Sequence, residues 1–482
     1  MQGMRATSSK LGRKVRALRR REGITQAALA EKLGISASYL NLIEHDRRPL
    51  SAPLLIKLAQ LYDLDLKSFA GGEDARLLED LLEVFGDPIF EDHPVPSREV
   101  RELVATAPEV ARGVGHLYHA FQTARSSAQS LAERVADGQD LSGVDRVRIS
   151  SELVSDFLQR NRNYFPELEE EADRLWRDAD LKVEDLYLGL ANYLEREHDV
   201  RVSIDKVGRL RGALRRFGPD RRELTLSIVL RRGSRNFQLA HQIGLLNCSE
   251  ILDRLSDDPL LTTEDARALS RVALANYFAA AVLMPYEPFL AATREERYDL
   301  DLLGHHFRAS FEQVCHRLTT LRRKRMEGVP FHMVRLDIAG NISKKFSAAG
   351  IHFPRFSGLC PLWNVHASFQ RPGMIRVQIS RLPDGTAFFS VARTVRKHRG
   401  GYHAPSVLHA IGLGCDLESA KQLVYTDGID LTNIKGVPVG ITCRMCDRVD
   451  CQARAFPSLQ RPLKIDENVR GLSFYTPVLD DE

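Results

Sequence analysis

The stretch ITQAALAEKLGISASYLNLIEHDRRPLS, residues 24–51, predicts two short helices joined by a tight glycine turn. Thr25 stands where the N-cap of the first helix belongs, and Gly34 is placed to end that helix. Ser36 is placed to cap the second helix, which is predicted to end near Glu44. Two short helices joined in this way have the geometry of a helix-turn-helix.

Further helices are predicted on both sides of this pair, with apolar periodicity before Gly23 and over residues 52–62 and 65–69. The segment resembles the XRE family, the lambda-repressor and Cro-like helix-turn-helix proteins, over about 60 residues. Gln26, Leu29-Ala30, Gly34, Tyr39-Leu40, Ile43-Glu44 and the Arg-Pro pair carry this resemblance. It implies a five-helix DNA-binding domain.

The second helix of the pair is expected to read DNA, because the major groove accepts one helix and short polar side chains near its N-terminus reach base edges. The expected base-facing residues are Ser36, Ala37, Ser38 and Asn41. The residues expected to contact phosphates, which fix register without reading sequence, are Gln26, Arg47 and Arg48. Glu44 is expected to be structural.

Charge is unevenly distributed along the chain. Residues 1–50 carry 11 Lys or Arg against 4 Asp or Glu, although the net charge of all 482 residues is only +4. This asymmetry favours a polyanionic partner for the N-terminal part, here a double-stranded DNA operator. One such module offers little surface for selective binding, so a homodimer or homotetramer is expected.

Helical patterns continue over residues 71–140, with breaks at Asp87-Pro88 and Pro108, and predict a connector or dimerisation element. Residues 200–204 and 224–230 are predicted to form a hairpin. FQLAHQIGLLN (237–247) and ALANYFAAAVLMPYEPF (273–289) then resemble the ImmA/IrrE metallopeptidase domain, whose first signature helix is of the H-E-x-x-H type. The second motif is nearly intact.

The first motif is broken at the positions that carry the chemistry. Zinc hydrolysis on such a helix needs two histidines at i and i+4 and a glutamate beside the first as general base. Here His241 remains, but Gln242 replaces the base and Leu245 the second ligand, and residues 270–274 contain no carboxylate to serve as a third. We therefore predict a pseudo-peptidase domain without enzymatic activity, in which His241 is a packed helix residue.

After Gly328 the pattern changes to short alternating runs with turn residues between them, which predict an antiparallel sheet like those of sensor domains. The segment CRMCDRVDCQARAFP follows near the end. Its cysteines, at C-x2-C-x4-C spacing, are Cys443, Cys446 and Cys451. A structural zinc site, a redox-sensitive thiol set and plain packing all remain open. Zinc would need a fourth ligand, and the candidates are Cys360, Cys415, His366 and His409.

Taken together, the XRE module, the degenerate ImmA/IrrE domain and the segments FSGLCPLWNVH, ARTVRKHRGG and CRMCDRVDCQARAFP resemble the short-chain fatty acyl regulator (ScfR) family across nearly all the chain. The resemblance implies a regulator that answers to acyl-CoA thioesters, such as acetyl-CoA or propionyl-CoA, and controls acetate or propionate metabolism. CoA carries several phosphate charges, which cationic side chains bind. The expected ligand residues are Trp363, His366, Arg393, Arg396, Lys397 and Arg399.

The chain as a whole is predicted to be multidomain and mainly α, with an α+β C-terminal part. The expected divisions are the helix-turn-helix domain (1–70), the helical connector (71–140), the IrrE-like α+β domain (141–328) and a sensor-like antiparallel-sheet domain (329–482). Few cysteines, no secretory signal pattern and no apolar run near 20 residues predict a cytoplasmic protein without a membrane partner. No cofactor is expected to be required. The rival functions are an active zinc metallopeptidase that cleaves a repressor and an antitoxin-like interaction module.

Overall fold

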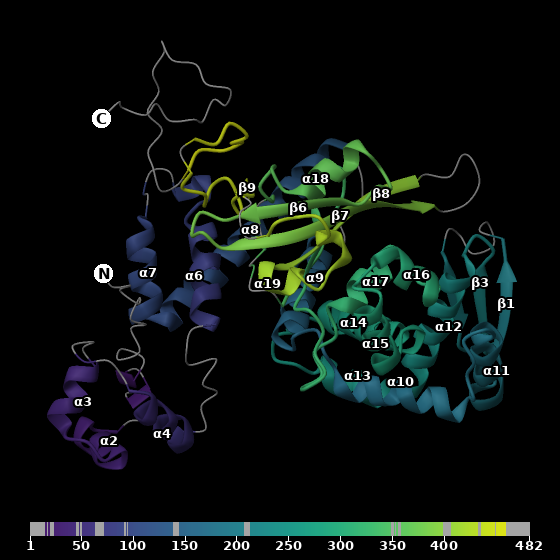
Figure 1. Cartoon of the computed structure of the whole chain (residues 1–482), viewed down its shortest axis with the longest axis horizontal. Helices are drawn as coiled ribbons and strands as arrows, with labels where there is room; N and C mark the ends of the chain where they lie inside the picture. Colours follow the sequence, from purple (N-terminus) through teal and green to yellow (C-terminus); the bar gives the residue numbers. More distant parts are fainter. Residues whose placement is uncertain are drawn as a thin grey trace, which may run out of the picture. The chain divides into compact units, whose positions relative to one another are not determined.

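The computed structural model describes residues 15–16, 18–19, 24–44, 48, 51–62, 72–90, 93, 95–137, 144–206, 213–348, 351, 353–354, 358–398, 406–431, 435–448 and 450–458. The chain divides into two compact units, and the division falls between Ala124 and Arg125. The structure is mainly helical and contains two mixed sheets (Figure 1). The predicted helix over residues 65–69 lies outside the described residues.

The first unit begins with the predicted helix-turn-helix. Its helices are α2 (Gln26–Leu33), α3 (Ala37–Glu44) and α4 (Ala52–Tyr62). The Thr25 hydroxyl accepts a hydrogen bond from the Ala28 N–H, and Gly34 adopts the left-handed conformation (φ 70°) that ends α2. A small core of leucines, including Leu29, Leu40 and Leu58, packs the helices together. The predicted caps and the glycine turn are therefore confirmed.

The rest of the first unit is helical, as predicted. Its elements are α6 (Gly72–Val84), the 3-10 turn η1 (Pro88–Phe90), α7 (Ser97–Thr106) and the start of α8 (Pro108–Asp137). The breaks at Asp87-Pro88 and Pro108 are confirmed. The Asp87 carboxylate accepts hydrogen bonds from the Tyr118 hydroxyl and the Gln122 amide, so the turn at the end of α6 is fixed against α8.

The second unit is built around α14, a helix whose alanines let its neighbours approach closely. The helices of this part are α9 (Val144–Arg160), α10 (Pro166–Asp178), α11 (Leu186–His198), α12 (Arg232–Asn247), α13 (Ser249–Ser256), α14 (Glu264–Leu283), α15 (Tyr286–Glu295), α16 (Leu300–His306) and α17 (Phe311–Leu318). α14 packs against α9, α10, α12 and α13. No described helix is by itself long and apolar enough to cross a membrane; α14 and α15 together meet that test with a 64° bend between them.

A buried ion pair links three of these helices. The guanidinium of Arg317, on α17, pairs with the Glu169 carboxylate of α10 at 2.6 Å, and both side chains are at most 1% exposed. Tyr277 of α14 donates its hydroxyl to the same carboxylate, and Arg317 also donates to the Met284 carbonyl. The carboxylate therefore has several charged or polar partners, which a buried charge requires.

The small sheet of this unit differs from the prediction. Its strands are β1 (Arg201–Asp205), β2 (Arg215–Gly218) and β3 (Glu223–Ser227), in the order β1-β3-β2. β1 and β3 are parallel, whereas β2 and β3 form the antiparallel pair. The predicted hairpin between residues 200–204 and 224–230 is therefore wrong: the antiparallel partner of β3 is β2, a short arginine-rich segment without the apolar alternation that marks a strand.

The C-terminal part contains a six-stranded sheet in the order β5-β4-β8-β7-β6-β9. Its strands are β4 (His332–Leu336), β5 (Ile342–Ser347), β6 (Arg376–Arg381), β7 (Ala387–His398), β8 (Ser406–Asp416) and β9 (Val437–Pro438). All neighbours are antiparallel except β6 and β9. The predicted antiparallel sheet is thus confirmed, with β4, β6 and β7 near the expected positions; β5, β8 and the parallel β9 were not predicted.

The two faces of this sheet belong to different cores, because successive side chains along a strand point to opposite faces. On β7, Phe389 and Val391 pack with the helices of the second unit. Phe388 and Ala392 pack instead with Trp363 beside the short helix α18 (Asn364–Ala367). Figure 1 shows the sheet between α18 and the group formed by α14 to α17.

Replacing Arg317 by alanine is expected to lower the free energy of unfolding by about 3–5 kcal/mol, because Glu169 is left buried without a countercharge. Urea denaturation followed by circular dichroism measures this loss. Arg254→Ala is the matched control, since its partner Glu167 also lies on α10 but that pair is exposed, so little change is expected. Similar losses in the two variants would contradict the role given to the buried pair.

Candidate functional site

The start of α3 presents a small polar surface. The Ser36 hydroxyl accepts from the Tyr39 N–H, which caps the helix, and lies 3.1 Å from the Ser38 hydroxyl. Ser36, Ala37, Ser38 and Asn41 are all exposed. The structure therefore gathers the four expected base-facing residues on one accessible end of α3, and their contacts with bases stay a prediction.

Beneath this surface a network fixes α2 against α3. Glu44 is 1% exposed and its carboxylate accepts two hydrogen bonds from the Arg19 guanidinium, at 2.6 and 3.0 Å. The Gln26 amide donates to Glu44 at 2.9 Å and to Asn41 at 3.3 Å. Glu44 is thus structural, but through Arg19 and Gln26; the turn after α3, which it was expected to tie, lies outside the described residues. The Gln26 amide also orients the Asn41 side chain. Arg48 is exposed; Arg47 lies outside the described residues.

The degenerate metallopeptidase motif lies on α12, where a guanidinium contacts the remaining histidine. Arg215 reaches in from β2, and its Nη1 donates to His241 Nδ1 at 2.7 Å and to the Gln242 side-chain oxygen at 3.1 Å. His241 and Gln242 are 4% and 2% exposed. The positive charge of the Arg215 guanidinium beside this imidazole repels a divalent cation, so this arrangement disfavours zinc.

Burial, reinforced by the charge of Arg215, lowers the pKa of His241 to about 4. Its Nδ1 is therefore an unprotonated acceptor at neutral pH. The loss of the second ligand and of the base is predicted from the sequence, but Arg215 is not singled out there. That residue is one of six arginines between positions 209 and 222, and only folding decides which of them reaches α12.

The expected ligand residues do not form one site. Arg393 and Lys397 lie on the helix-facing side of β7, where Arg393 pairs with Asp301 and stacks 5.1 Å from the Phe311 ring, and Lys397 pairs with Glu312. Trp363 packs on the opposite side of the sheet and donates its indole N–H to the Gly440 carbonyl. These groups are therefore separated by the sheet.

The other expected ligand residues are also dispersed. His366, on α18, is half-buried, and its Nε2 has no hydrogen-bond partner among the described residues. Arg396 is exposed, and strand alternation points it to the face opposite Arg393 and Lys397. Arg399 lies outside the described residues. Among the described members of this set, Arg393 and Lys397 share the helix-facing side of β7.

The cysteine segment follows β9 and is tied to the edge of the sheet, where the Arg448 guanidinium donates to the carbonyls of Val439 and of Arg381 on β6. Cys446 is buried, and Cys443 and Cys451 are partly exposed. Of the four proposed fourth ligands, Cys360 lies next to this segment, and its N–H donates to the Ile441 carbonyl. Burial is the main cause that raises the pKa of the Cys360 thiol, and the neighbouring Cys443 and Cys446 raise it further. Within the described ranges no group of three or more His, Cys, Asp or Glu side chains is arranged to hold a metal. The zinc site stays a prediction.

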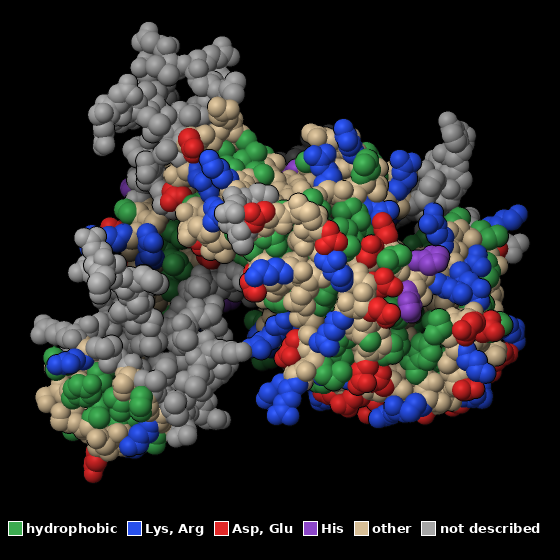
Figure 2. All heavy atoms as spheres, viewed as in Figure 1, with side chains coloured by type: hydrophobic (Ala, Val, Ile, Leu, Met, Phe, Trp, Pro, Cys, Tyr) green, Lys and Arg blue, Asp and Glu red, His purple; other side chains and the backbone are tan. Residues whose placement is uncertain are grey.

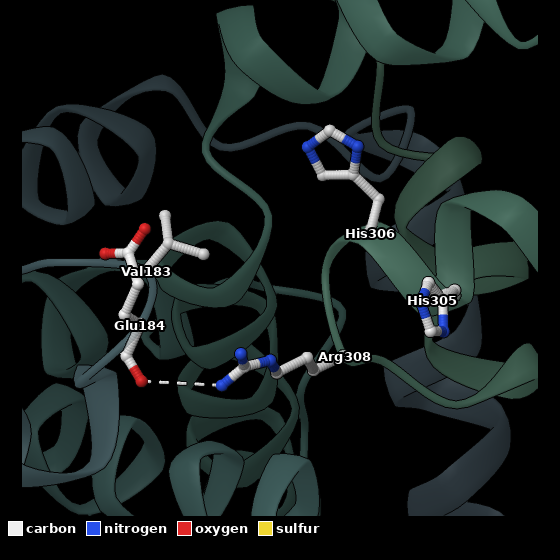
Figure 3. Close-up of a pocket in the computed structure, with 6 residues that line it drawn as sticks. Val183, Glu184, His305, His306 and Arg308 are labelled. Atoms are coloured by element: carbon white, nitrogen blue, oxygen red, sulfur yellow. Dashed lines mark hydrogen bonds between the residues drawn. The ribbon is translucent and has the colours of Figure 1, made fainter.

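A pocket of about 470 Å³ lies beside α16 and is lined by Val183, Glu184, Gly304, His305, His306 and Arg308. Figure 2 shows histidine side chains near α16 among charged neighbours. In Figure 3 the two histidines point in different directions, and Arg308 donates to the backbone carbonyl of Glu184 at 3.4 Å while the Glu184 carboxylate turns away. The side chains do not converge on one point, so the pocket lacks the geometry of a metal or catalytic site.

The fold and these sites define a helix-turn-helix transcriptional regulator that carries a metallopeptidase-like domain. Three family models match the chain in succession: a helix-turn-helix domain at residues 10–68, an IrrE N-terminal-like domain at 195–319, and the C-terminal domain of short-chain fatty acyl coenzyme A regulators at 320–475. The chain belongs to the family of short-chain fatty acyl coenzyme A regulators.

Relatives along nearly the whole length support this membership. The HTH-type transcriptional regulator PrpR of Mycobacterium tuberculosis is 39% identical, with 95% of this chain and 93% of that protein covered. RamB of the same species is also 39% identical, and the propionyl-CoA carboxylase regulator of Cereibacter sphaeroides is 38% identical; each match covers 96% of this chain and 98% of the relative. A solved structure of a Mycobacterium tuberculosis transcriptional regulator, 41% identical, matches with a TM-score of 0.65 and covers 68% of this chain and 99% of that one.

The double variant Ser38→Glu with Asn41→Glu is expected to lose selective DNA binding, because two carboxylates at the start of α3 repel phosphates and cannot reproduce the polar contacts to base edges. Both positions are exposed, so the fold should persist. Fluorescence anisotropy with operator duplexes measures the loss, expected to be about 30-fold or more at two contacts of 1–3 kcal/mol each. Ala105→Glu, exposed on α7, adds a charge to the same unit and should bind nearly as the parent does; unchanged affinity of the α3 variant would contradict the prediction.

The buried histidine of α12 predicts acid lability. The unfolded chain takes up a proton near pH 6.5, its ordinary value, whereas folded His241 does so only near pH 4. Stability is therefore unaffected by this group above pH 6.5 and falls as the pH drops from 6.5 toward 4, by about 3 kcal/mol in total. Urea unfolding at a series of pH values measures this. His241→Gln should show a shallower fall than the parent across the same range, and an identical pH dependence would count against this interpretation.

Proposed function

We propose that this protein is a cytoplasmic, sequence-specific transcriptional regulator whose affinity for its operator is set by a short-chain acyl-CoA such as acetyl-CoA or propionyl-CoA. The observation that carries the proposal is the union, in one chain, of an exposed polar α3 with a C-terminal domain matching that of short-chain fatty acyl coenzyme A regulators. The name of one relative, the propionyl-CoA carboxylase regulator, points to the same class of metabolite.

The arrangement on α12 weighs against the rival peptidase. A catalytic zinc needs three protein ligands and an open position for water. Here Arg215 contacts the remaining histidine, and Gln242 has replaced the general base. The domain is better suited to a structural or ligand-binding role than to hydrolysis.

Regulation of this kind requires a coupling between two sites. The effector must bind one conformation of the chain more tightly than another, and DNA must distinguish the same two conformations. The α3 surface and the C-terminal sheet lie in different units of the chain. A homodimer or homotetramer that places two α3 helices on successive turns of DNA is the expected binding form.

Footprinting on the upstream region of the protein's own gene tests this proposal. A protected site is expected at low salt, with an affinity that falls steeply as salt rises. Propionyl-CoA or acetyl-CoA is expected to change the affinity by about 5- to 150-fold, the usual size of such a coupling, whereas free CoA controls for the acyl group. Absence of a protected site would overturn the DNA-binding role, and a site insensitive to every acyl-CoA would overturn the effector alone.

A further inference from the structure

Four cationic side chains lie on the helix-facing side of the six-stranded sheet, on three of its strands. Lys344 of β5 is in register with Arg335 of β4, Arg335 with Ile411 of β8, and Ile411 with Arg393 of β7. Lys397 follows Arg393 four residues later on β7 and so lies on the same face. We call Lys344, Arg335, Arg393 and Lys397 the cation band.

Two carboxylates from the neighbouring helices oppose the cation band. Glu312 of α17 contacts three of its members: Arg335 at 2.7 Å, Lys397 at 2.9 Å and Lys344 at 3.1 Å. Asp301 of α16 pairs with Arg393 at 2.5 Å. One carboxylate therefore serves three cations, and the band keeps an excess of positive charge.

The band also keeps unused hydrogen-bond donors. The side chains of Lys344 and Lys397 are 47% and 51% exposed, and each ammonium has three N–H groups, of which Glu312 needs one. Buried nitrogens of two side chains, Arg393 Nε and His409 Nδ1, lack a hydrogen-bond partner in the part of the chain that the structure describes. A buried polar atom without a partner costs free energy unless a ligand or water supplies one.

The remaining charged neighbour does not cancel the excess. Asp337 lies near His409, but its carboxylate already accepts hydrogen bonds from the Asn341 side chain and from the N–H groups of Ala339 and Asn341. Even when it is counted, four cations face three carboxylates. The surface between α17 and β5-β4-β8-β7 is thus a concentrated, solvent-accessible source of charged donors.

We propose that the cation band is a binding site for a ligand with clustered phosphate groups, held chiefly by Lys344 and Lys397 with Arg335 behind them. Phosphate oxygens suit this set because lysine and arginine form short, charge-assisted hydrogen bonds with them. Glu312 already neutralises part of the positive charge, so the ligand must compete with its carboxylate for the cations. The phosphates can belong to an acyl-CoA or to a separate phosphorylated metabolite, and the proposal does not depend on the effector named above.

Isothermal titration calorimetry on the full chain at low salt tests this site with two probes, pyrophosphate and propionyl-CoA. Lys344→Ala with Lys397→Ala is expected to weaken binding of at least one probe by 10-fold or more, because two charge-assisted contacts are lost. Glu312→Gln is expected to tighten binding of the same probe several-fold, because the opposing carboxylate is removed. A purely structural role for Glu312 predicts no such gain.

Lys421→Ala is the matched control, since it removes an exposed cation that pairs with Glu418 outside the cation band, and its binding should stay within about twofold of the parent. If the double-lysine variant loses binding of both probes, the cation band binds the phosphates of acyl-CoA. If it loses binding of pyrophosphate alone, the band binds another phosphorylated ligand. The proposal is overturned if the parent binds neither probe, or if the double-lysine variant binds both as the parent does. In the latter case an acyl-CoA effect on the operator would still stand.

Discussion

The buried pairing of Arg317 with Glu169 is the constraint on which the second unit depends. Removing two charges from water is costly, so the pair is tolerated only because Tyr277 and the Met284 carbonyl complete its hydrogen bonds. These groups come from α10, α17 and α14 with its C-terminal end, so their hydrogen bonds tie the three helices to one another. α17 is thereby held in place, and Glu312, five residues before Arg317, is presented to the C-terminal sheet.

The metallopeptidase-like domain keeps the packing of its signature helices although two positions of the H-E-x-x-H motif differ on α12. His241 remains on α12, but its ring accepts a hydrogen bond from a guanidinium, and Gln242 offers that guanidinium a neutral oxygen. A glutamate at this position would form an ion pair with Arg215 rather than activate water. The polar groups of this site therefore have partners within the protein. The buried side chains of α12 pack in the large core of the second unit, to which the six-stranded sheet also contributes.

The C-terminal sheet separates residues that the sequence had grouped. Trp363 lies under one face, in a core that includes Cys360 and Val439, whereas Arg393 and Lys397 lie on the other, against α16 and α17. Alternation along a strand makes this division unavoidable once the register is set. The cysteine segment and the cation band are therefore distinct regions of the domain. The first offers thiols to a ligand, and the second offers cationic side chains.

The sequence by itself determined the helix-turn-helix, with its caps at Thr25 and Ser36 and its glycine turn, because capping and helical periodicity are local properties of the chain. It also determined the loss of the second zinc ligand and three strands of the large sheet, β4, β6 and β7. Only the tertiary structure decided that Arg215 contacts His241, that β1 pairs parallel to β3, and that Glu169 meets Arg317 from 148 positions away. Such contacts join residues whose separation along the chain carries no periodic or local signal, so only packing of the whole unit selects them.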